Sequence, residues 1–129
     1  MRLRIRLLEP KLAIVRLKPD QPPPAMTGEF FAFVRSAGEL SVVMDQRRAP
    51  RKATKSTGWR LFQLEGPFDL TLTGVLASAA APLADAGCSI FALATYDTDY
   101  FLIRGGQLQK AIRALRAAGH DVIDKTAAT

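Results

Sequence analysis

Apolar residues recur at spacings of three and four between positions 72 and 83, which predicts a helix with one apolar face. The face consists of Leu72, Val75, Leu76, Ala79, Ala80 and Leu83. Pro82 lies within this helix and removes the backbone hydrogen bond to the Ser78 carbonyl, so we expect an irregular last turn. Gly87 then supplies the left-handed residue at which many helices end.

Two apolar, partly aromatic runs follow this helix, Ile90 to Ala94 and Tyr100 to Ile103, and both are typical of strands. The short polar residues between them predict a tight turn. A strand from Trp59 to Glu65 precedes the helix, and a second amphipathic helix and a strand from His120 to Ile123 follow the hairpin. The apolar face of that helix consists of Leu108, Ala111, Ile112 and Leu115, and Gly119 ends it.

Residues 58–123 thus have the order β-α-β-β-α-β. Because crossover connections are right-handed, both helices are expected on one face of a four-stranded antiparallel sheet. The pattern predicts the α+β class and a ferredoxin-like arrangement, a fold that hosts enzymes, RNA-binding proteins and sensors alike.

The first half of the chain is rich in strands. Residues 2–7 alternate Arg with Leu or Ile, and residues 12–17 continue as an apolar run, which fits an edge strand or a broken long strand. Phe30 to Arg35 and Glu39 to Met44 predict a hairpin that echoes the later one at an offset of 60 residues. Three consecutive prolines, residues 22–24, replace the helix expected before it. We therefore expect a degenerate repeat.

The run GPFDLTLTGVLASAAAPLADAGCSIFALATYDTDYFLI resembles an ACT domain, and within that superfamily the group related to the CASTOR-type arginine sensors. Weaker similarity extends back through FFAFVRSAGELSVV and LAIVRL. The resemblance implies a degenerate ACT-like half over residues 1–57 and an ACT domain over residues 58–129. It also implies a regulatory amino-acid-binding protein without catalysis of its own.

Charge is unevenly distributed along these 129 residues, whose net charge is +6. Residues 1–60 carry 13 Lys or Arg and 5 Asp or Glu, whereas residues 61–129 carry 5 and 7. Much of the excess lies between Arg47 and Arg60, which we interpret as a solvated loop. The sequence has no signal peptide and no long apolar run, and its single cysteine forms no internal disulfide, so we expect a cytoplasmic protein.

The chemistry available for catalysis is sparse. With one His, one Cys and no spaced ligand set, we expect neither an enzyme nor a metal or cofactor site. Cys88 is interpreted as a small core residue and His120 as a surface or helix-capping residue.

The candidate binding site combines the loop before the first helix with the hairpin turn. Backbone amides around Asp69, Leu70 and Thr71 suit a carboxylate, and the turn carboxylates suit an ammonium, so together they suit a zwitterionic and possibly cationic amino acid. The turn contributes Tyr96, Asp97, Thr98 and Asp99. The resemblance strengthens Asp99 and adds Ser41 and Val42, and we expect Ser41 and Asp99 to border one pocket at a seam between two modules.

Two alternatives remain open on the sequence. The same fold presents a sheet to RNA in other proteins, but the basic segment lacks interleaved aromatic residues, so we expect no nucleic-acid partner. The second alternative is a dimerisation module whose pocket is vestigial. We expect a homodimer, no membrane association and an unknown protein partner that receives the signal.

Overall fold

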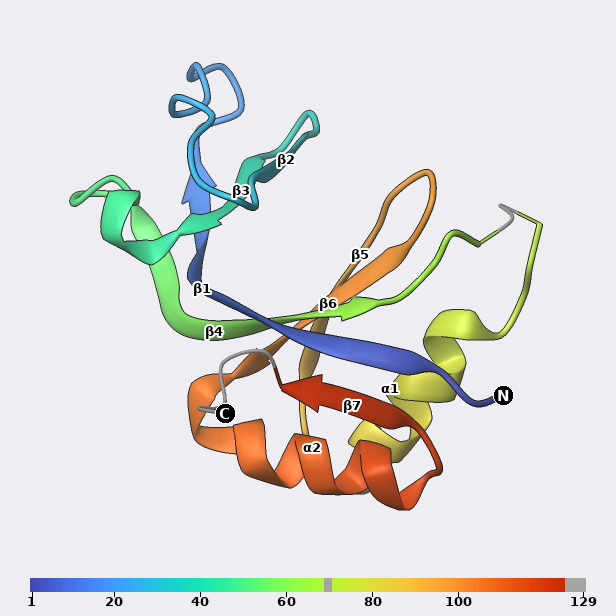
Figure 1. The fold of residues 1–129 in the computed structure, drawn as a ribbon. Coiled ribbons are helices and arrows are strands. Elements are labelled where there is room, and N and C mark those ends of the chain that lie inside the picture. The colour runs from blue at the N-terminus through green and yellow to red at the C-terminus, as the bar shows by residue number, and fades with distance from the viewer. Residues whose placement is uncertain (69–70, 125–129) are drawn as a thin grey trace. The chain divides into compact units, whose positions relative to one another are not determined.

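The computed structural model describes residues 1–68 and 71–124 (Figure 1). The described residues fall into two compact units: unit 1 comprises residues 1–9, 60–68 and 71–124, and unit 2 comprises residues 10–59. The boundary between the units lies within two long strands, β1 (Arg4–Leu17) and β4 (Thr54–Leu64), so each strand contributes residues to both.

Unit 1 has the predicted order of strands and helices. After β4 come α1 (Val75–Asp85), β5 (Ile90–Ala94), β6 (Asp99–Arg104), the short 3-10 helix η2 (Gly105–Gln107), α2 (Leu108–Ala117) and β7 (Asp121–Asp124). Strands β5 and β6 pair antiparallel, with Ala94 opposite Asp99 next to the turn. Figure 1 shows both helices on one face of the sheet. The ferredoxin-like α+β fold is confirmed.

The sheet of unit 1 differs from the expected four antiparallel strands. Its order is β7-β1-β4-β6-β5, because the N-terminal part of β1 lies between β7 and β4. Residues Arg4 to Leu7 pair with Asp121 to Asp124 in parallel. Of the two alternatives for residues 2–7, the long strand holds, since β1 runs from Arg4 to Leu17. The edge strand is wrong, because β1 is interior and its Ile5 and Leu7 are fully buried against the core.

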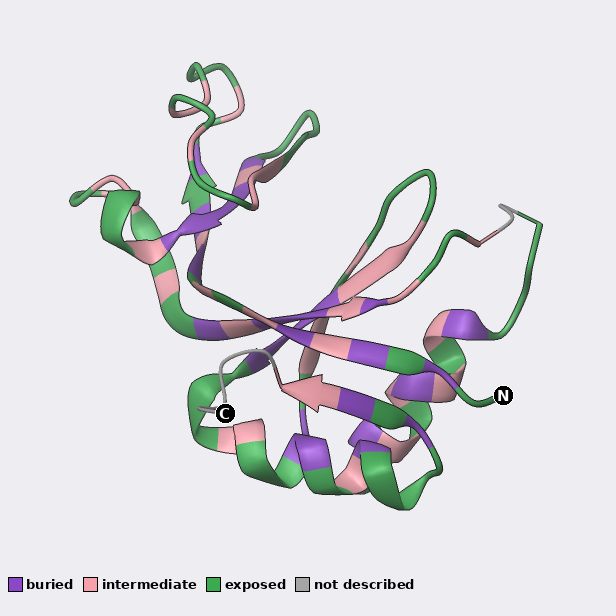
Figure 2. Cartoon of the chain, in the orientation of Figure 1, coloured by how far each residue is buried: buried purple, intermediate pink, exposed green. Residues whose placement is uncertain are grey.

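The core of unit 1 lies between the sheet and the two helices. Phe62 of β4 and Phe101 of β6 stack with ring centroids 5.0 Å apart. The second helix buries Ala111, Ile112 and Leu115, as predicted. Cys88 is also part of this core, which confirms the prediction for it. Figure 2 shows the buried residues of both helices and strands.

The first helix begins later than its apolar spacing predicted. Gly74 has a φ of +83° and precedes the helix, so α1 starts at Val75. Val75, Ala79 and Leu83 form the buried face. Leu72 lies in the preceding loop and is 49% exposed, which corrects its assignment to the helix.

His120 is buried, so the prediction of a surface position is wrong. Its Nδ1 accepts a hydrogen bond from the Leu3 N–H at 3.1 Å, and its Nε2 lies 2.8 Å from the Ser78 carbonyl oxygen. Because the Leu3 N–H can only donate, Nδ1 carries no proton and Nε2–H donates to Ser78. This carbonyl is the one that Pro82 leaves without its helical partner. The imidazole therefore satisfies a backbone group of α1 and one of the N-terminal segment.

Unit 2 consists of a small antiparallel sheet and a basic connection. β2 (Ala32–Arg35) pairs with β3 (Leu40–Asp45), which confirms the first hairpin, and β3 pairs with residues 12–17 of β1. One core cluster comprises Ala13, Val15, Leu17, Leu40, Val42 and Met44.

The basic segment of unit 2 is more ordered than the solvated loop we expected. It contains the 3-10 helix η1 (Gln46–Arg48) and, from Thr54, the beginning of β4. Asp45 caps η1 by accepting a hydrogen bond from the Arg47 N–H at 2.9 Å. The side-chain hydrogen bonds from Arg47 lower the pKa of Asp45 to about 2. In the described parts of the chain no helix is long and apolar enough to cross a membrane.

Replacing His120 should destabilise the protein through these two hydrogen bonds. His120→Ala leaves the buried Leu3 N–H without its acceptor and opens a void, so we expect a loss of about 2 to 4 kcal/mol in the free energy of unfolding. Urea denaturation measures this loss. Arg113→Ala, at an exposed position of α2, is the control and should change it by less than about 0.5 kcal/mol. Equal stability of the two variants would contradict the role given to His120.

Candidate functional site

A hollow of about 150 Å³ lies in unit 1 between the tip of the β5–β6 hairpin and the segment that precedes α1. Phe68, Leu72 and Val75 form its apolar wall, and residues 94–99 of the hairpin form the other. Pockets for drug-sized ligands have roughly 300 to 1,000 Å³, so this hollow is smaller than most of them. Its size therefore suits a ligand smaller than a typical drug.

The two walls are joined by backbone hydrogen bonds. The Phe68 N–H donates to the Asp97 carbonyl at 2.7 Å, and the Thr98 hydroxyl donates to the carbonyl of Leu64. Gly66 lies so close to the hairpin that an added Cβ would be 2.7 Å from the Asp97 carbonyl oxygen. The hairpin tip and the loop after β4 therefore hold each other in place.

The turn of the hairpin is built by its two threonines. The Thr95 N–H donates to the Thr98 carbonyl at 2.8 Å, and the Thr98 N–H donates to the Thr95 hydroxyl at 3.3 Å. These contacts confirm the predicted turn and leave Tyr96 at the tip, 77% exposed.

The carboxylates of Asp97 and Asp99 are not used by the turn. Neither makes an ion pair with any residue in 1–68 or 71–124. Asp97 is exposed and Asp99 is half-buried, and both line the hollow. Two carboxylates beside an apolar wall form an arrangement that can hold a cationic group while a hydrocarbon chain packs against the wall.

The structure brings together four of the predicted site residues, Tyr96, Asp97, Thr98 and Asp99. Thr71 is exposed in the loop before α1, and Asp69 and Leu70 lie outside the described residues. Ser41 and Val42 belong to β3 of unit 2, where Ser41 is half-buried and Val42 is fully buried in the core. That Ser41 shares a pocket with Asp99 stays a prediction.

Sequence reasoning missed the apolar wall of the hollow. Phe68 was not singled out, and Leu72 and Val75 were assigned to one helix face. The available signal was Gly74, because a glycine between Leu72 and Val75 can interrupt the helix and turn Leu72 out of its apolar face.

The fold of unit 1 agrees with the match of this part of the chain to a known protein family. Residues 55–117 match the model of the ACT domain. The chain therefore contains an ACT domain over residues 55–117. This confirms the resemblance seen in the sequence.

Among curated proteins, the chain is similar to the "Cytosolic arginine sensor for mTORC1 subunit 1" of Homo sapiens and of Bos taurus, each 33% identical over 95 residues. The match covers 67% of this chain and 29% of each relative. The chain thus spans less than a third of the length of these relatives.

Two solved structures extend the comparison over almost the whole chain. The protein Atu0741 from Agrobacterium tumefaciens is 31% identical with a TM-score of 0.92, over 100% of this chain and 98% of that one. The ligand-free regulatory subunit of aspartate kinase from Thermus thermophilus is 12% identical with a TM-score of 0.64, over 89% of this chain and 97% of that one. At this identity the second match shows a shared fold only.

The close approach of Gly66 to the hairpin can be tested by adding one methyl group. Gly66→Ala should push the Asp97 carbonyl away and cost about 1 to 3 kcal/mol of unfolding free energy, because the facing atom is rigid backbone. Urea denaturation gives the cost, and backbone amide NMR shifts at residues 95–99 should report displacement of the tip. Gly106→Ala is the matched control, since its added Cβ meets nothing within 4 Å. Unchanged hairpin shifts in Gly66→Ala would refute the close contact.

Proposed function

We propose that the protein is a cytoplasmic, non-enzymatic regulatory protein that binds a free amino acid in the hollow at the β5–β6 hairpin. The observation that carries the proposal is the pair of carboxylates, Asp97 and Asp99, which lie beside an apolar wall and form no ion pair with the described residues. The match of residues 55–117 to the ACT domain supports it, as does the similarity to proteins described as arginine sensors.

The cationic group and the aliphatic part of an amino acid have counterparts among the residues that line the hollow. A cationic group of the ligand is placed on Asp99, with Asp97 adding negative charge from the same turn. The aliphatic part of its side chain packs on Phe68, Leu72 and Val75. Its carboxylate is assigned to the backbone amides around residues 69–71, as the sequence predicted. A cationic amino acid fits this set better than an acidic one, because a second ligand carboxylate would face two like charges.

Regulation follows if the bound ligand favours one state of the protein. The loop after β4 and the hairpin both line the hollow and bond to each other, so a ligand between them changes the free energy of both. The signal passes to another protein, whose identity the chain does not reveal.

The proposal is tested first by a thermal-shift screen with the free amino acids. A ligand at 100 times its Kd should add about 2.7 kcal/mol of native stability, which raises the melting temperature by several degrees. If no amino acid shifts the transition at millimolar concentration, the hollow is vestigial and the dimerisation module becomes the better hypothesis.

Asp99→Asn should then weaken binding of the amino acid that scores. The change keeps the shape and removes the charge that holds the ammonium, so we expect a loss of about 2 kcal/mol or more, roughly thirtyfold in Kd. Calorimetric titration of wild type and variant measures it. Asp85→Asn, the same substitution at an exposed position of α1 outside the hollow, should leave Kd within about twofold. Equal affinity in wild type and Asp99→Asn would show that Asp99 is only a turn residue.

We also propose that the protein forms a homodimer. β5 is at one end of the unit 1 sheet and β2 ends the paired strands of unit 2, so both can add a strand from a second copy. Light scattering should give twice the chain mass of 14.1 kDa at micromolar concentration. A monomer mass at high concentration, with and without ligand, would rule the dimer out.

A further inference from the structure

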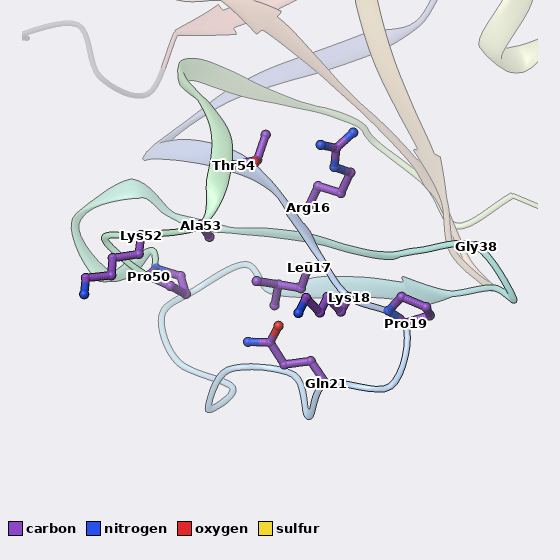
Figure 3. A pocket seen from close by; sticks show the side chains of 10 residues that line it. All are labelled: Arg16, Leu17, Lys18, Pro19, Gln21, Gly38, Pro50, Lys52, Ala53 and Thr54. Carbon is purple, nitrogen blue, oxygen red and sulfur yellow. The ribbon is translucent and has the colours of Figure 1, made fainter.

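Unit 2 contains a second hollow, of about 610 Å³, where β1 ends and the chain enters the proline-rich segment (Figure 3). Its lining includes three cationic side chains, Arg16, Lys18 and Lys52, and two neutral polar ones, Gln21 and Thr54. The remaining lining residues are apolar or small. One water molecule occupies about 30 Å³ in liquid water, so the volume of this hollow is far larger than a single small oxyanion requires.

The cations of this hollow lack internal counterions. Arg16, Lys18 and Lys52 form no ion pair with any residue in the described part of the chain, and no carboxylate residue is among those that line the hollow. The nearest acids in the sequence, Asp20 and Glu39, follow lining residues but do not line the hollow themselves. Asp45, the buried acid of the unit, is bonded to Arg47.

Two more cations are fixed to the backbone of the lining. The Arg35 guanidinium donates to the Gln21 carbonyl at 3.1 Å, and the Lys55 ammonium donates to the Pro50 carbonyl at 2.8 Å. Residues 10–59 carry nine Lys or Arg against four Asp or Glu. Five of the six net positive charges of the chain therefore belong to unit 2, and a group at the hollow lies in their combined field.

We propose that this hollow binds a small anion that carries two or more phosphate groups. Ammonium and guanidinium groups both donate charge-assisted hydrogen bonds to phosphate oxygens. In Figure 3 the side chains of Arg16 and Lys52 point away from those of Lys18 and Gln21, so the cations are spread around the hollow. Cations spread in this way match an anion with separated charges better than one compact oxyanion.

A nucleic acid fits the hollow less well than a small anion. Single-stranded nucleic acids bind along grooves in which aromatic side chains stack on successive bases. The residues that line this hollow include no aromatic side chain, so its chemistry recognises charge rather than bases. The hollow also lies in the unit that does not contain the amino-acid site, so the two proposals can fail independently.

Inorganic pyrophosphate is the probe for this proposal. Calorimetry on the full chain at about 0.1 M salt should show saturable binding, tighter than that of orthophosphate and weakened by added salt. Lys18→Gln and Lys52→Gln should each raise the Kd at least about threefold, because each removes one charge-assisted contact. Lys11→Gln, at an exposed position of β1 outside the hollow, and Lys110→Gln, on α2, are the same substitution elsewhere and should stay within about twofold.

Four outcomes would overturn the proposal. They are no saturable binding of pyrophosphate at millimolar concentration, an equal loss in all four variants, orthophosphate binding as tight as pyrophosphate, and tighter binding of a short single-stranded oligodeoxynucleotide that depends on the same two lysines. An equal loss would mean that only the net charge matters. The oligodeoxynucleotide result would assign the hollow to nucleic acid instead.

Discussion

Unit 1 depends on the insertion of residues 4–7 between β7 and β4. The strand buries Ile5 and Leu7 completely, and β7 has only four residues, so neither would be stable as an isolated strand. Its start is fixed by several bonds: His120 accepts from the Leu3 N–H, the Asp121 N–H donates to the Leu3 carbonyl, and the Ser78 hydroxyl donates to the Met1 carbonyl. The core of unit 1 therefore closes only when residues from both ends of the described chain have met, a non-local requirement that slows folding.

The candidate site, like the sheet of unit 1, depends on contacts between segments that are distant in the sequence. The hairpin tip is local in sequence, but its position is set by contacts with the loop that follows β4. Gly66 allows the backbones to approach, and Gly74 ends the loop by adopting a φ of +83°. Between these two glycines the chain presents Phe68 and Leu72 to the hairpin. The hollow is thus produced by two backbone constraints, and the carboxylates of the turn supply its charge.

Elements with a regular side-chain period could be predicted from the sequence. Both hairpins and the apolar face of α2 were predicted because each depends on neighbouring residues. The partner of residues 4–7 could not be predicted, since alternation shows that a strand has two faces but not which strand lies beside it. The beginning of β4 was hidden because its exposed residues are basic and polar, as in a solvated loop.

The charged part of the candidate site could be predicted from the sequence, but its apolar wall could not. The turn carboxylates stand out in the sequence because short polar residues between two apolar runs predict a tight turn. In the structure the threonines form the turn's hydrogen bonds, and the carboxylates are left available to a ligand. The apolar wall does not stand out, because Leu72 and Val75 continue a helical spacing that only the conformation of Gly74 breaks. The burial of His120 was equally hidden, since its two bonding partners lie 117 and 42 residues away.

The charge distribution separates the chemistry of the two units. Unit 2 is stabilised by an apolar cluster, and among its described residues the one ion pair joins Arg47 to Asp45. Exposed ion pairs contribute little to folding, and an excess of like charge opposes it through self-repulsion. Arg35 and Lys55 hold backbone carbonyls of unit 2, but Arg16, Lys18 and Lys52 form no ion pair with the described residues and so add no ion-pair energy to its folding. Charges that form no ion pair among the described residues attract groups of opposite sign from solution, which is the physical basis of both proposals: an anion at unit 2 and a cationic group at the acidic hairpin of unit 1.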